Sequence, residues 1–429
     1  MKLPTLHSGL IYTAANIASA GIPFLLIPVL TRALTPAEYG KVVSFYMLIA
    51  VAACVAGLSS HGAVGVRWMA HTRGDPRSFT GAALLVTFFT SSLAMIAAAV
   101  IGPMFKLGLG ALPCAMAALT AGTMVVQGSR FAVWQVKGEA LKAGALQVGS
   151  AALNLGLSLA AVLLLGWGGF GRIAGITIAG VLITVVAVAT LGRENSIAKP
   201  RRRDVGEVIR FGAPLMPHVL AGALLTNADR FAVSAQLGTA ALGIYGAATQ
   251  LGQIMGVLAD AISKTYMPTI YKMLAQDSRR SKLKLVAALY LSVPGWLAVA
   301  AMMWPVLLLA SHFLLGPRYQ EAGHLAFWFL LGGALNAIYT NISALFFFKS
   351  RTEFLSVCTV TTATLSFLSA GFAVRTLGID GGGATYVLAQ LVLLVMTVVL
   401  SLRISPLPWN RPALAMRVLF RRTQAGGAV

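Results

Sequence analysis

Long apolar stretches alternate with short polar breaks along the whole chain. Each stretch is about 20 residues long, which is the length with which a helix crosses the hydrocarbon core of a bilayer. A backbone in lipid must satisfy its own hydrogen bonds, so each stretch predicts a transmembrane helix and the chain an all-α membrane fold. The twelve predicted spans are 9–31, 41–65, 79–101, 107–128, 143–166, 171–191, 211–228, 241–263, 285–310, 325–348, 354–374 and 383–402.

One polar stretch, residues 193–210, divides these spans into two sets of six. Its basic side chains outnumber its three carboxylates, so we expect it to lie in water as a hinge linker between two membrane-embedded lobes. After the last span, a short basic amphipathic segment is expected to lie on the membrane surface. The predicted organisation is a lobe over 1–192, the linker over 193–210, a second lobe over 211–403 and a basic tail over 404–429.

Composition agrees with an integral membrane protein. The 429 residues are 58% hydrophobic and 10% charged, whereas soluble domains carry roughly 25% charged residues. The net charge of +21 lies in the breaks between apolar runs rather than on one soluble face, so no nucleic-acid partner is expected.

The positions of the 33 Lys and Arg residues predict the orientation. If both termini are cytoplasmic, 26 of these 33 residues fall on the cytoplasmic side, as expected of an integral membrane protein with several spans. The outer loops are short and leave no room for an extracytoplasmic domain. The residues on the other side are Arg32, Lys41, Lys106, Arg172, Arg230, Arg318 and Arg375.

The two halves also resemble each other in sequence. A shift of 203 residues aligns them without a gap and places Gly9 on Gly212, and residues 34–40 on residues 237–243. Both of these segments fall between the first and second helix of a half. Because each half has an even number of spans, the pattern favours a parallel repeat about an axis along the membrane normal, with chance similarity among apolar helices as the alternative.

Motifs for catalysis or metal binding are absent from the sequence. It contains no phosphate-binding G-x-x-x-x-G-K-[ST] loop, no H-E-x-x-H, no G-x-S-x-G and no paired cysteine motif. We therefore expect no catalytic residues, no metal site, no cofactor and no enzymatic activity.

Ionisable residues near membrane depth are costly and therefore candidate functional residues. Asp229 and Arg230 end the seventh span, and an interfacial ion pair is the alternative interpretation. Asp260 and His218 are the candidates for binding a coupling ion, although a local pair with Lys264 also explains Asp260. The remaining candidates lie at span ends, where snorkelling to the interface is the alternative for each; they are Arg32, Arg67, Arg130 and Lys264.

Proline pairs interrupt two helices that are equivalent under the 203-residue shift. Pro23 and Pro28 lie in the first span, and Pro214 and Pro217 lie at the start of the seventh. Proline frees a carbonyl group and allows a bend, and broken helices in corresponding places point to a transport pathway. We expect these prolines to act in gating, with a static kink as the alternative.

Two segments resemble the polysaccharide-biosynthesis, or Wzx-type oligosaccharide flippase, family of the multidrug/oligosaccharidyl-lipid/polysaccharide exporter superfamily. They are residues 27–40 (IPVLTRALTPAEYG), and in the second half Asn227–Phe231 (NADRF) with Leu242–Ala248 (LGIYGAA). The resemblance extends over nearly the whole chain in span count and repeat. It implies a V-shaped transporter of two six-helix lobes around a central cationic cavity, working by alternating access.

The resemblance further implies the substrate, an undecaprenyl-diphosphate-linked oligosaccharide flipped for O-antigen, lipopolysaccharide, capsule or exopolysaccharide synthesis. Expected partners are membrane lipids, the lipid-linked oligosaccharide, and a polysaccharide polymerase with its chain-length regulator. Within the family motif, Asp229 and Arg230 are the predicted substrate-binding residues. Arg and Lys suit a diphosphate, so Arg32, Arg67, Arg130 and Lys264 join them.

Two other functions stay open. A drug/cation antiporter of the same superfamily would favour acidic groups deep in the first lobe, but residues 1–128 contain only Glu38 and Asp75, both in loop regions. A membrane polysaccharide polymerase or glycosyltransferase would need catalytic residues on a sizeable outer loop, which the predicted topology does not provide.

Overall fold

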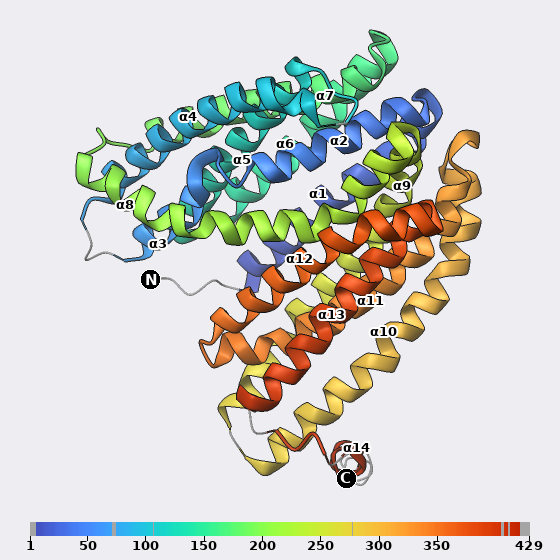
Figure 1. The fold of residues 1–429 in the computed structure, drawn as a ribbon. Helices are drawn as coiled ribbons and strands as arrows, with labels where there is room; N and C mark the ends of the chain where they lie inside the picture. The colour runs from blue at the N-terminus through green and yellow to red at the C-terminus, as the bar shows by residue number, and fades with distance from the viewer. Residues whose placement is uncertain are drawn as a thin grey trace. The chain divides into compact units, whose positions relative to one another are not determined.

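The structure is a computed structural model that describes residues 6–70, 74–105, 107–276, 278–404, 407–410 and 412–420. All regular elements among these residues are helical, which confirms the predicted all-α fold (Figure 1). The contacts group the chain into two compact units. Unit 1 comprises Met1–Ala247 with Leu314–Tyr319, and unit 2 comprises Ala248–Phe313 with Gln320–Val429. The grouping by contacts divides the chain after Ala247 and not around residues 193–210. The predicted lobe boundaries therefore stay a prediction.

Unit 1 holds eight complete α-helices and the first part of a ninth, joined by short turns. The helices are α1 (Leu6–Ala33), α2 (Pro36–Ala52), α3 (Ser60–Met69), α4 (Pro76–Ile101), α5 (Ala111–Lys137), α6 (Ala140–Leu159), α7 (Gly168–Arg193), α8 (Arg202–Gly212) and the beginning of α9 (Met216–Ala275). The turns are η1 (Ala56–Ser59), η2 (Gly102–Met104), the π-helical η3 (Ala160–Leu164), η4 (Ala213–Leu215) and η5 (Pro317–Tyr319).

Unit 2 holds the remainder of α9 and the helices that follow it. In this unit α11 and α12 both pack against α13. The helices are α10 (Arg279–Leu314), whose last residue belongs to unit 1, α11 (Glu321–Phe348), α12 (Thr352–Leu377), α13 (Ile379–Ile404) and α14 (Pro412–Phe420).

The predicted spans fall on helical segments of the described residues, although 41–65 covers α2, η1 and α3, and both 211–228 and 241–263 fall within the segment Arg202–Ser263. Ten helical segments there are long and apolar enough to cross a membrane, and a pair bent by 58°, Pro36–Ala52 with Ala56–Met69, gives an eleventh. The 60-residue α9 would be about 90 Å long if continuous, three times the hydrocarbon thickness. Gly238, with φ 83° and ψ −178°, breaks it between the predicted spans 211–228 and 241–263. The chain is therefore a multi-pass membrane protein.

Helix starts in unit 1 follow from local sequence. Thr35 caps α2: its hydroxyl accepts from the Glu38 N–H at 3.3 Å, and the Glu38 carboxylate accepts from the Thr35 N–H at 2.9 Å. This is a capping box, and Pro36 in the first turn loses no helical hydrogen bond. Asp75 caps α4 by accepting from the Arg77 N–H at 3.0 Å, and Pro76 follows it. These residue types prefer such positions, so the boundaries are encoded locally.

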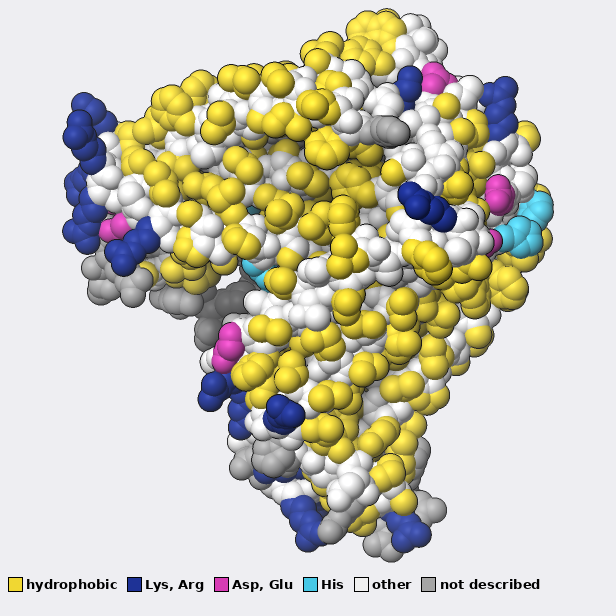
Figure 2. Space-filling model, in the orientation of Figure 1, with side chains coloured by type: hydrophobic (Ala, Val, Ile, Leu, Met, Phe, Trp, Pro, Cys, Tyr) yellow, Lys and Arg dark blue, Asp and Glu magenta, His cyan; other side chains and the backbone are white. Residues whose placement is uncertain are grey.

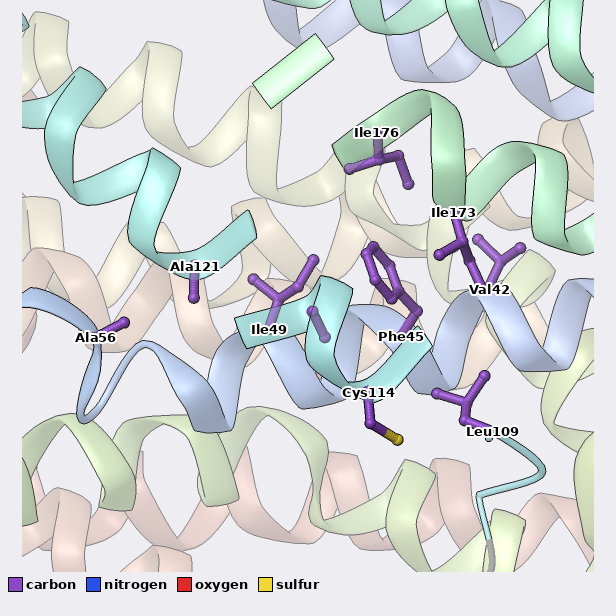
Figure 3. Close-up of a cluster of buried hydrophobic side chains, with 10 residues drawn as sticks. Val42, Phe45, Ile49, Ala56, Leu109, Cys114, Ala121, Ile173 and Ile176 are labelled. Carbon is purple, nitrogen blue, oxygen red and sulfur yellow. The ribbon is translucent and has the colours of Figure 1, made fainter. Parts of the chain in front are cut away.

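Small side chains allow the helices of unit 1 to pack closely. Phe45 of α2 is fully buried in a cluster between α2, α5 and α7 (Figure 3). Ala117 and Ala121 on α5 and Ile173 on α7 surround it. In lipid, helix association depends on such van der Waals packing rather than on the exclusion of water.

The outside of the helices is apolar (Figure 2). On α4, the side chains of Phe88, Phe89, Leu93 and Ile96 are all more than 60% exposed. An apolar surface of this extent is expected of a protein surrounded by acyl chains. Lys and Arg side chains gather at the end of unit 1 where α4 begins and α8 lies (Figures 1 and 2).

The predicted linker is docked on unit 1 and is partly helical. Its α8 packs against α3 and α4. The Ser78 hydroxyl of α4 donates to Asp204 Oδ2 of α8 at 2.6 Å, and the Ala198 N–H donates to the Arg77 carbonyl at 3.0 Å. Asp204 is buried by this contact. The segment therefore belongs to the packed structure of unit 1, whereas the sequence alone predicts a hinge.

Candidate functional site

A cavity in unit 1 is lined by neutral polar side chains. It has a volume of about 500 Å³ and lies between α1, α5 and α6. Amides and a hydroxyl group face it together with one aromatic ring, and none of its described lining residues is charged. The lining residues are Asn16, Gln127, Gly128, Phe131, Leu146, Gln147, Ser150, Ala151 and Asn154.

The side-chain amides that line this cavity are held in place by hydrogen bonds, but not all of their donors and acceptors are used. Gln147 Nε2 donates to Asn16 Oδ1 at 2.7 Å, which links α6 to α1. Gln127 Nε2 donates to the Gly180 carbonyl at 3.0 Å. A primary amide has two N–H donors and two acceptor lone pairs. Most of these positions have no partner among the described residues, so the cavity offers fixed donors and acceptors to a ligand.

A buried arginine, Arg172, contacts the wall of the cavity. Arg172, 4% exposed, donates to Asn154 Oδ1, a cavity-lining group, and to the Ser158 hydroxyl. It also donates to the Tyr46 hydroxyl at 2.8 Å. No carboxylate among the described residues pairs with Arg172. Its positive charge is therefore compensated only by neutral dipoles, and a buried charge held in this way near the start of an apolar helix is a candidate functional group.

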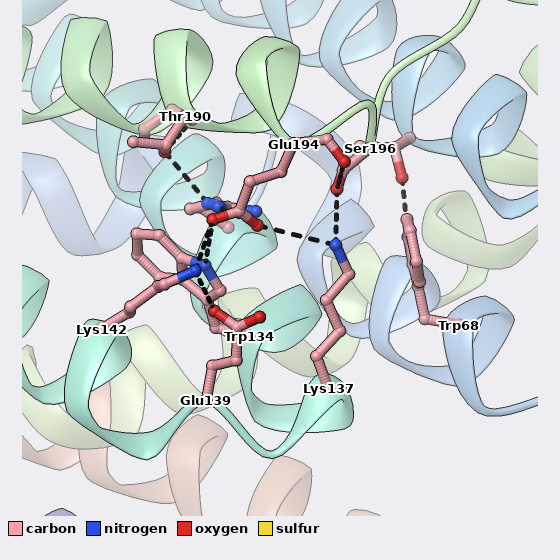
Figure 4. A network of polar contacts seen from close by, with 11 residues as sticks. Trp68, Trp134, Lys137, Glu139, Lys142, Thr190, Glu194 and Ser196 are labelled. Carbon is pink, nitrogen blue, oxygen red and sulfur yellow. Dashed lines mark hydrogen bonds and ion pairs between the residues drawn. The ribbon is translucent and has the colours of Figure 1, made fainter.

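Arg130, predicted to bind substrate, lies near the end of α5 in a polar network, and Figure 4 labels its partners Thr190 and Glu194. Its side chain is fully buried, with Nη2 2.7 Å from Glu194 Oε2 and the guanidinium carbon 3.7 Å from the Trp134 ring centroid. Nε donates to the Thr190 hydroxyl at 3.0 Å. The network fixes the end of α7 to α5, and Arg130 has no open path to a ligand in this arrangement.

Glu194 is the centre of that network (Figure 4). Besides Arg130, it accepts from Lys142 Nζ at 3.0 Å and from Trp134 Nε1 at 3.2 Å, and Lys137 Nζ lies 3.6 Å away. Burial by itself would raise the pKa of Glu194. The hydrogen bonds from Arg130, Lys142 and Trp134 and the charge of Arg130 outweigh burial and lower the pKa to about 2.

Arg67, another predicted substrate ligand, is also held by a carboxylate. It is 9% exposed, forms an ion pair with Glu207 of α8, and has its guanidinium carbon 4.3 Å from the centroid of the Phe79 ring. The contact joins α3 to the linker helix. The ion pair between Arg67 and Glu207 cannot be recognised from the sequence, because the two residues are 140 positions apart.

Asp229 and Arg230 lie near each other but engage different partners. Asp229 is 3% exposed and accepts from the Tyr245 hydroxyl at 2.6 Å through Oδ2, while Oδ1 has no hydrogen-bond partner in the described residues. Arg230 is half-buried and donates to Asn227 Oδ1 at 2.7 Å. The family motif that suggested these two residues thus places one buried carboxylate and one half-buried guanidinium on α9.

The other charged candidates are dispersed. Arg32 is exposed at the end of α1, Asp260 is exposed on α9 in unit 2, and His218 is exposed near the start of α9. The side chain of Lys264 lies outside the described part of the chain. The structure brings only Asp229 and Arg230 together, and the substrate and coupling-ion roles of this set stay predictions.

The prolines differ between the two equivalent helices. α1 is continuous from Leu6 to Ala33, through both Pro23, whose side chain is not described, and Pro28. Pro214 instead lies in the η4 turn and Pro217 in the first turn of α9. A helical interruption is therefore present at the second pair and not at the first, and a role in gating stays a prediction.

The cavity residues and Arg172 are the ones that sequence reasoning missed. Asn16, Gln127, Gln147 and Asn154 are uncharged and match no motif, and Arg172 was counted only as a loop residue at a span end. One signal was available: Asn and Gln are rare in apolar spans, where they hydrogen-bond between helices or line a pathway. The described residues contain no group of three or more His, Cys, Asp and Glu that could hold a metal ion.

Comparison with known proteins gives one family and a set of similar folds. The family described as "Polysaccharide biosynthesis protein" matches residues 5–274. An uncharacterized membrane protein of Haemophilus influenzae is 23% identical over 381 residues, covering 84% of this chain and 88% of the relative.

Two solved structures show the fold. The inward closed conformation of the lipid II flippase MurJ superposes with a TM-score of 0.72 at 11% identity, covering 98% of this chain and 94% of that one. A multidrug resistance MATE family transporter in its inward-facing conformation gives 0.71 at 15% identity, covering 92% and 95%. At these identities the likeness concerns architecture only.

Proposed function

Because the chain belongs to the polysaccharide biosynthesis protein family, we propose that it is a flippase for a lipid-linked oligosaccharide. It moves a polyprenyl-diphosphate-linked glycan, of the undecaprenyl type, across the bacterial inner membrane for surface polysaccharide synthesis. Its termini are cytoplasmic in this proposal, in keeping with the Lys and Arg distribution. A polysaccharide polymerase and its chain-length regulator then use the glycan outside.

The neutral amide-lined cavity is the observation that carries this proposal. Sugar hydroxyl groups both donate and accept hydrogen bonds, and amides such as Asn16, Gln147 and Asn154 supply both functions. Phe131 adds an apolar ring face. A pocket with a few convergent polar groups on an apolar wall is the usual form of a small-molecule site. Its uncharged lining fits a glycan better than an ion.

The diphosphate of the substrate requires positive charge. Arg172 is bound only to neutral groups and lies directly behind Asn154, so it raises the potential at the cavity wall. Arg230 and Arg32, with Lys264, remain the proposed contacts for the rest of the head group. We assign Arg67 and Arg130 to the scaffold within this proposal, because Glu207 and Glu194 already neutralise them.

A drug/cation antiporter is the second candidate. Such a transporter needs a carboxylate facing the ligand, and the cavity has none among its described lining residues. Asp229 and Asp260, with His218, are proposed as sites for a coupling ion. The buried, partly unpartnered Asp229 is the observation that favours ion binding at one of them.

Transport into vesicles tests the proposal. The full-length protein is reconstituted with a polyprenyl-diphosphate-linked oligosaccharide carrying a fluorescent sugar, and a membrane-impermeant quencher reports the accessible fraction over time. We expect Asn16→Ala/Gln147→Ala to slow translocation by roughly tenfold or more, since each lost hydrogen bond is worth about 1 kcal/mol.

The matched control is Asn336→Ala/Gln390→Ala, which removes an amide pair of the same kind (3.0 Å) between α11 and α13 in unit 2. Equal loss in both double variants would assign the effect to packing and contradict the proposed site. Transport of an organic cation such as ethidium without movement of the lipid-linked sugar would establish the antiporter instead.

A further inference from the structure

An apolar groove runs along unit 1 where the linker helix α8 meets α4. It has a volume of about 310 Å³ and is open to the outside. Phe89 on α4 and Ile209 on α8 form its exposed edges, being 62% and 45% exposed. Its lining residues are Leu58, Leu85, Val86, Phe89, Thr90, Val205 and Ile209.

The groove offers nothing to a polar ligand. Thr90 is its one polar lining residue, and its hydroxyl is already used: it accepts from the Gly57 N–H at 2.8 Å and donates to the Val86 carbonyl at 2.8 Å. A hydrocarbon chain is therefore the chemistry that fits, because it needs only apolar contacts.

Two arginines without a carboxylate partner lie on α8 beside the groove. Arg202 and Arg210 are exposed, and no carboxylate among the described residues pairs with either. Arg203, in contrast, is bound to Glu207 at 3.0 Å. Gly206 lies between Arg202 and Arg210 at spacings of four residues, with open space where a side chain would be.

Helix geometry places these arginines next to the groove. Arg202, Gly206 and Arg210 form a stripe adjoining the groove-lining stripe of Val205 and Ile209. Eight residues at about 1.5 Å each separate the arginines by roughly 12 Å, which two long side chains can span toward one phosphate above Gly206. The site thus combines the apolar groove with the two cationic side chains of Arg202 and Arg210 on either side of Gly206.

We propose that this site binds an anionic glycerophospholipid. One acyl chain lies in the groove between α4 and α8, and the headgroup phosphate is bound by Arg202 and Arg210. Charge complementarity selects an anionic lipid over a zwitterionic one. The lipid then contacts the linker helix directly, so binding stabilises the docking of α8 on α4. The proposal does not depend on what the protein transports.

Native mass spectrometry of the full-length protein tests it. The protein is released from mixed nanodiscs of phosphatidylglycerol and phosphatidylcholine, and the lipids retained are counted. We expect one preferentially retained phosphatidylglycerol, and a loss of that preference by roughly tenfold in Arg202→Ser/Arg210→Ser. The control Arg279→Ser/Arg280→Ser removes the same charge from the exposed start of α10 in unit 2 and is expected to keep the preference.

The hydrocarbon part is tested separately with Ile209→Asn, which places an amide in the groove and is expected to weaken retention of both lipids at this site. An equal loss in the two arginine double variants would show a diffuse charge effect and overturn the proposal. So would equal retention of phosphatidylglycerol and phosphatidylcholine, or displacement of bound lipid by a polyprenyl phosphate at equimolar concentration.

Discussion

Gly40 and Gly243 lie against each other's helix in unit 1. A β-carbon on Gly40 would overlap the carbonyl of Thr239, and a β-carbon on Gly243 would overlap the carbonyl of Pro36. Both glycines and both carbonyl residues are separated by 203 residues, the offset of the sequence repeat. The contact is therefore reciprocal, as at an interface about a two-fold axis. It is the closest structural counterpart of the repeat seen in the sequence.

Alanine at either glycine is expected to destabilise unit 1. A methyl group at Gly243 meets backbone, which cannot rotate away, so α2 and α9 must separate. Overpacking of this kind costs about 1–3 kcal/mol. Thermal unfolding in detergent should show a lower midpoint for Gly40→Ala and for Gly243→Ala.

Gly222→Ala is the control for this pair, because Gly222 lies in the same helix α9 with open space around it. There, alanine is expected to be neutral or stabilising, since it has the higher helix propensity. If the unfolding midpoint is unchanged in all three variants, a methyl group at the contact between α2 and α9 causes no overpacking, and the prediction is wrong.

Replacement of Glu194 is expected to be severe. Glu194→Gln leaves the fully buried Arg130 without its counter-charge, and breaking a buried ion pair in this way costs about 3–5 kcal/mol. Glu139→Gln is the matched control, since Glu139 pairs with the exposed Lys142 at 2.5 Å and is itself one-third exposed. Unfolding titrations in sodium dodecyl sulfate would measure both. Equal, small effects would mean that Arg130 is solvated or finds another partner.

Glu194 also predicts a pH dependence. Its pKa in the folded protein is about 2, below the ordinary 4.5, so the folded state favours the carboxylate. The stabilisation is fully present above about pH 4.5 and is lost as the pH falls toward 2. The difference in unfolding midpoint between the wild-type protein and Glu194→Gln should therefore shrink between pH 5 and pH 2. A difference that stays constant over this range would contradict the assignment.

The docked linker gives a prediction for proteolysis. Asp204→Ala removes the 2.6 Å hydrogen bond to Ser78, which fastens α8 to α4. Trypsin should then cleave at Arg201–Arg203 several-fold faster in the folded protein, because cleavage requires local opening. Glu353→Ala, which removes an exposed acidic side chain in unit 2, serves as the control. Equal cleavage rates in the wild-type protein and Asp204→Ala would indicate that the linker is held by other contacts.

The sequence by itself determined the membrane class and the approximate positions of the apolar helices, and it encodes individual helix starts. These features depend on local physics: an apolar run of about 20 residues satisfies its own backbone in lipid, and Thr35 or Asp75 caps the helix that follows. The offset of 203 residues was also readable, because both copies keep a glycine where helices approach closely.

Only the tertiary structure decided what the polar side chains do. Arg67 and Arg130 look like ligands in sequence, yet Glu207 and Glu194 neutralise them across separations of 140 and 64 residues. The amides of Asn16 and Gln147 become a cavity wall only when α1 and α6 pack together. The reason is that helix formation is local, whereas charge pairing and cavity formation depend on which helices become neighbours, and apolar periodicity does not encode that choice.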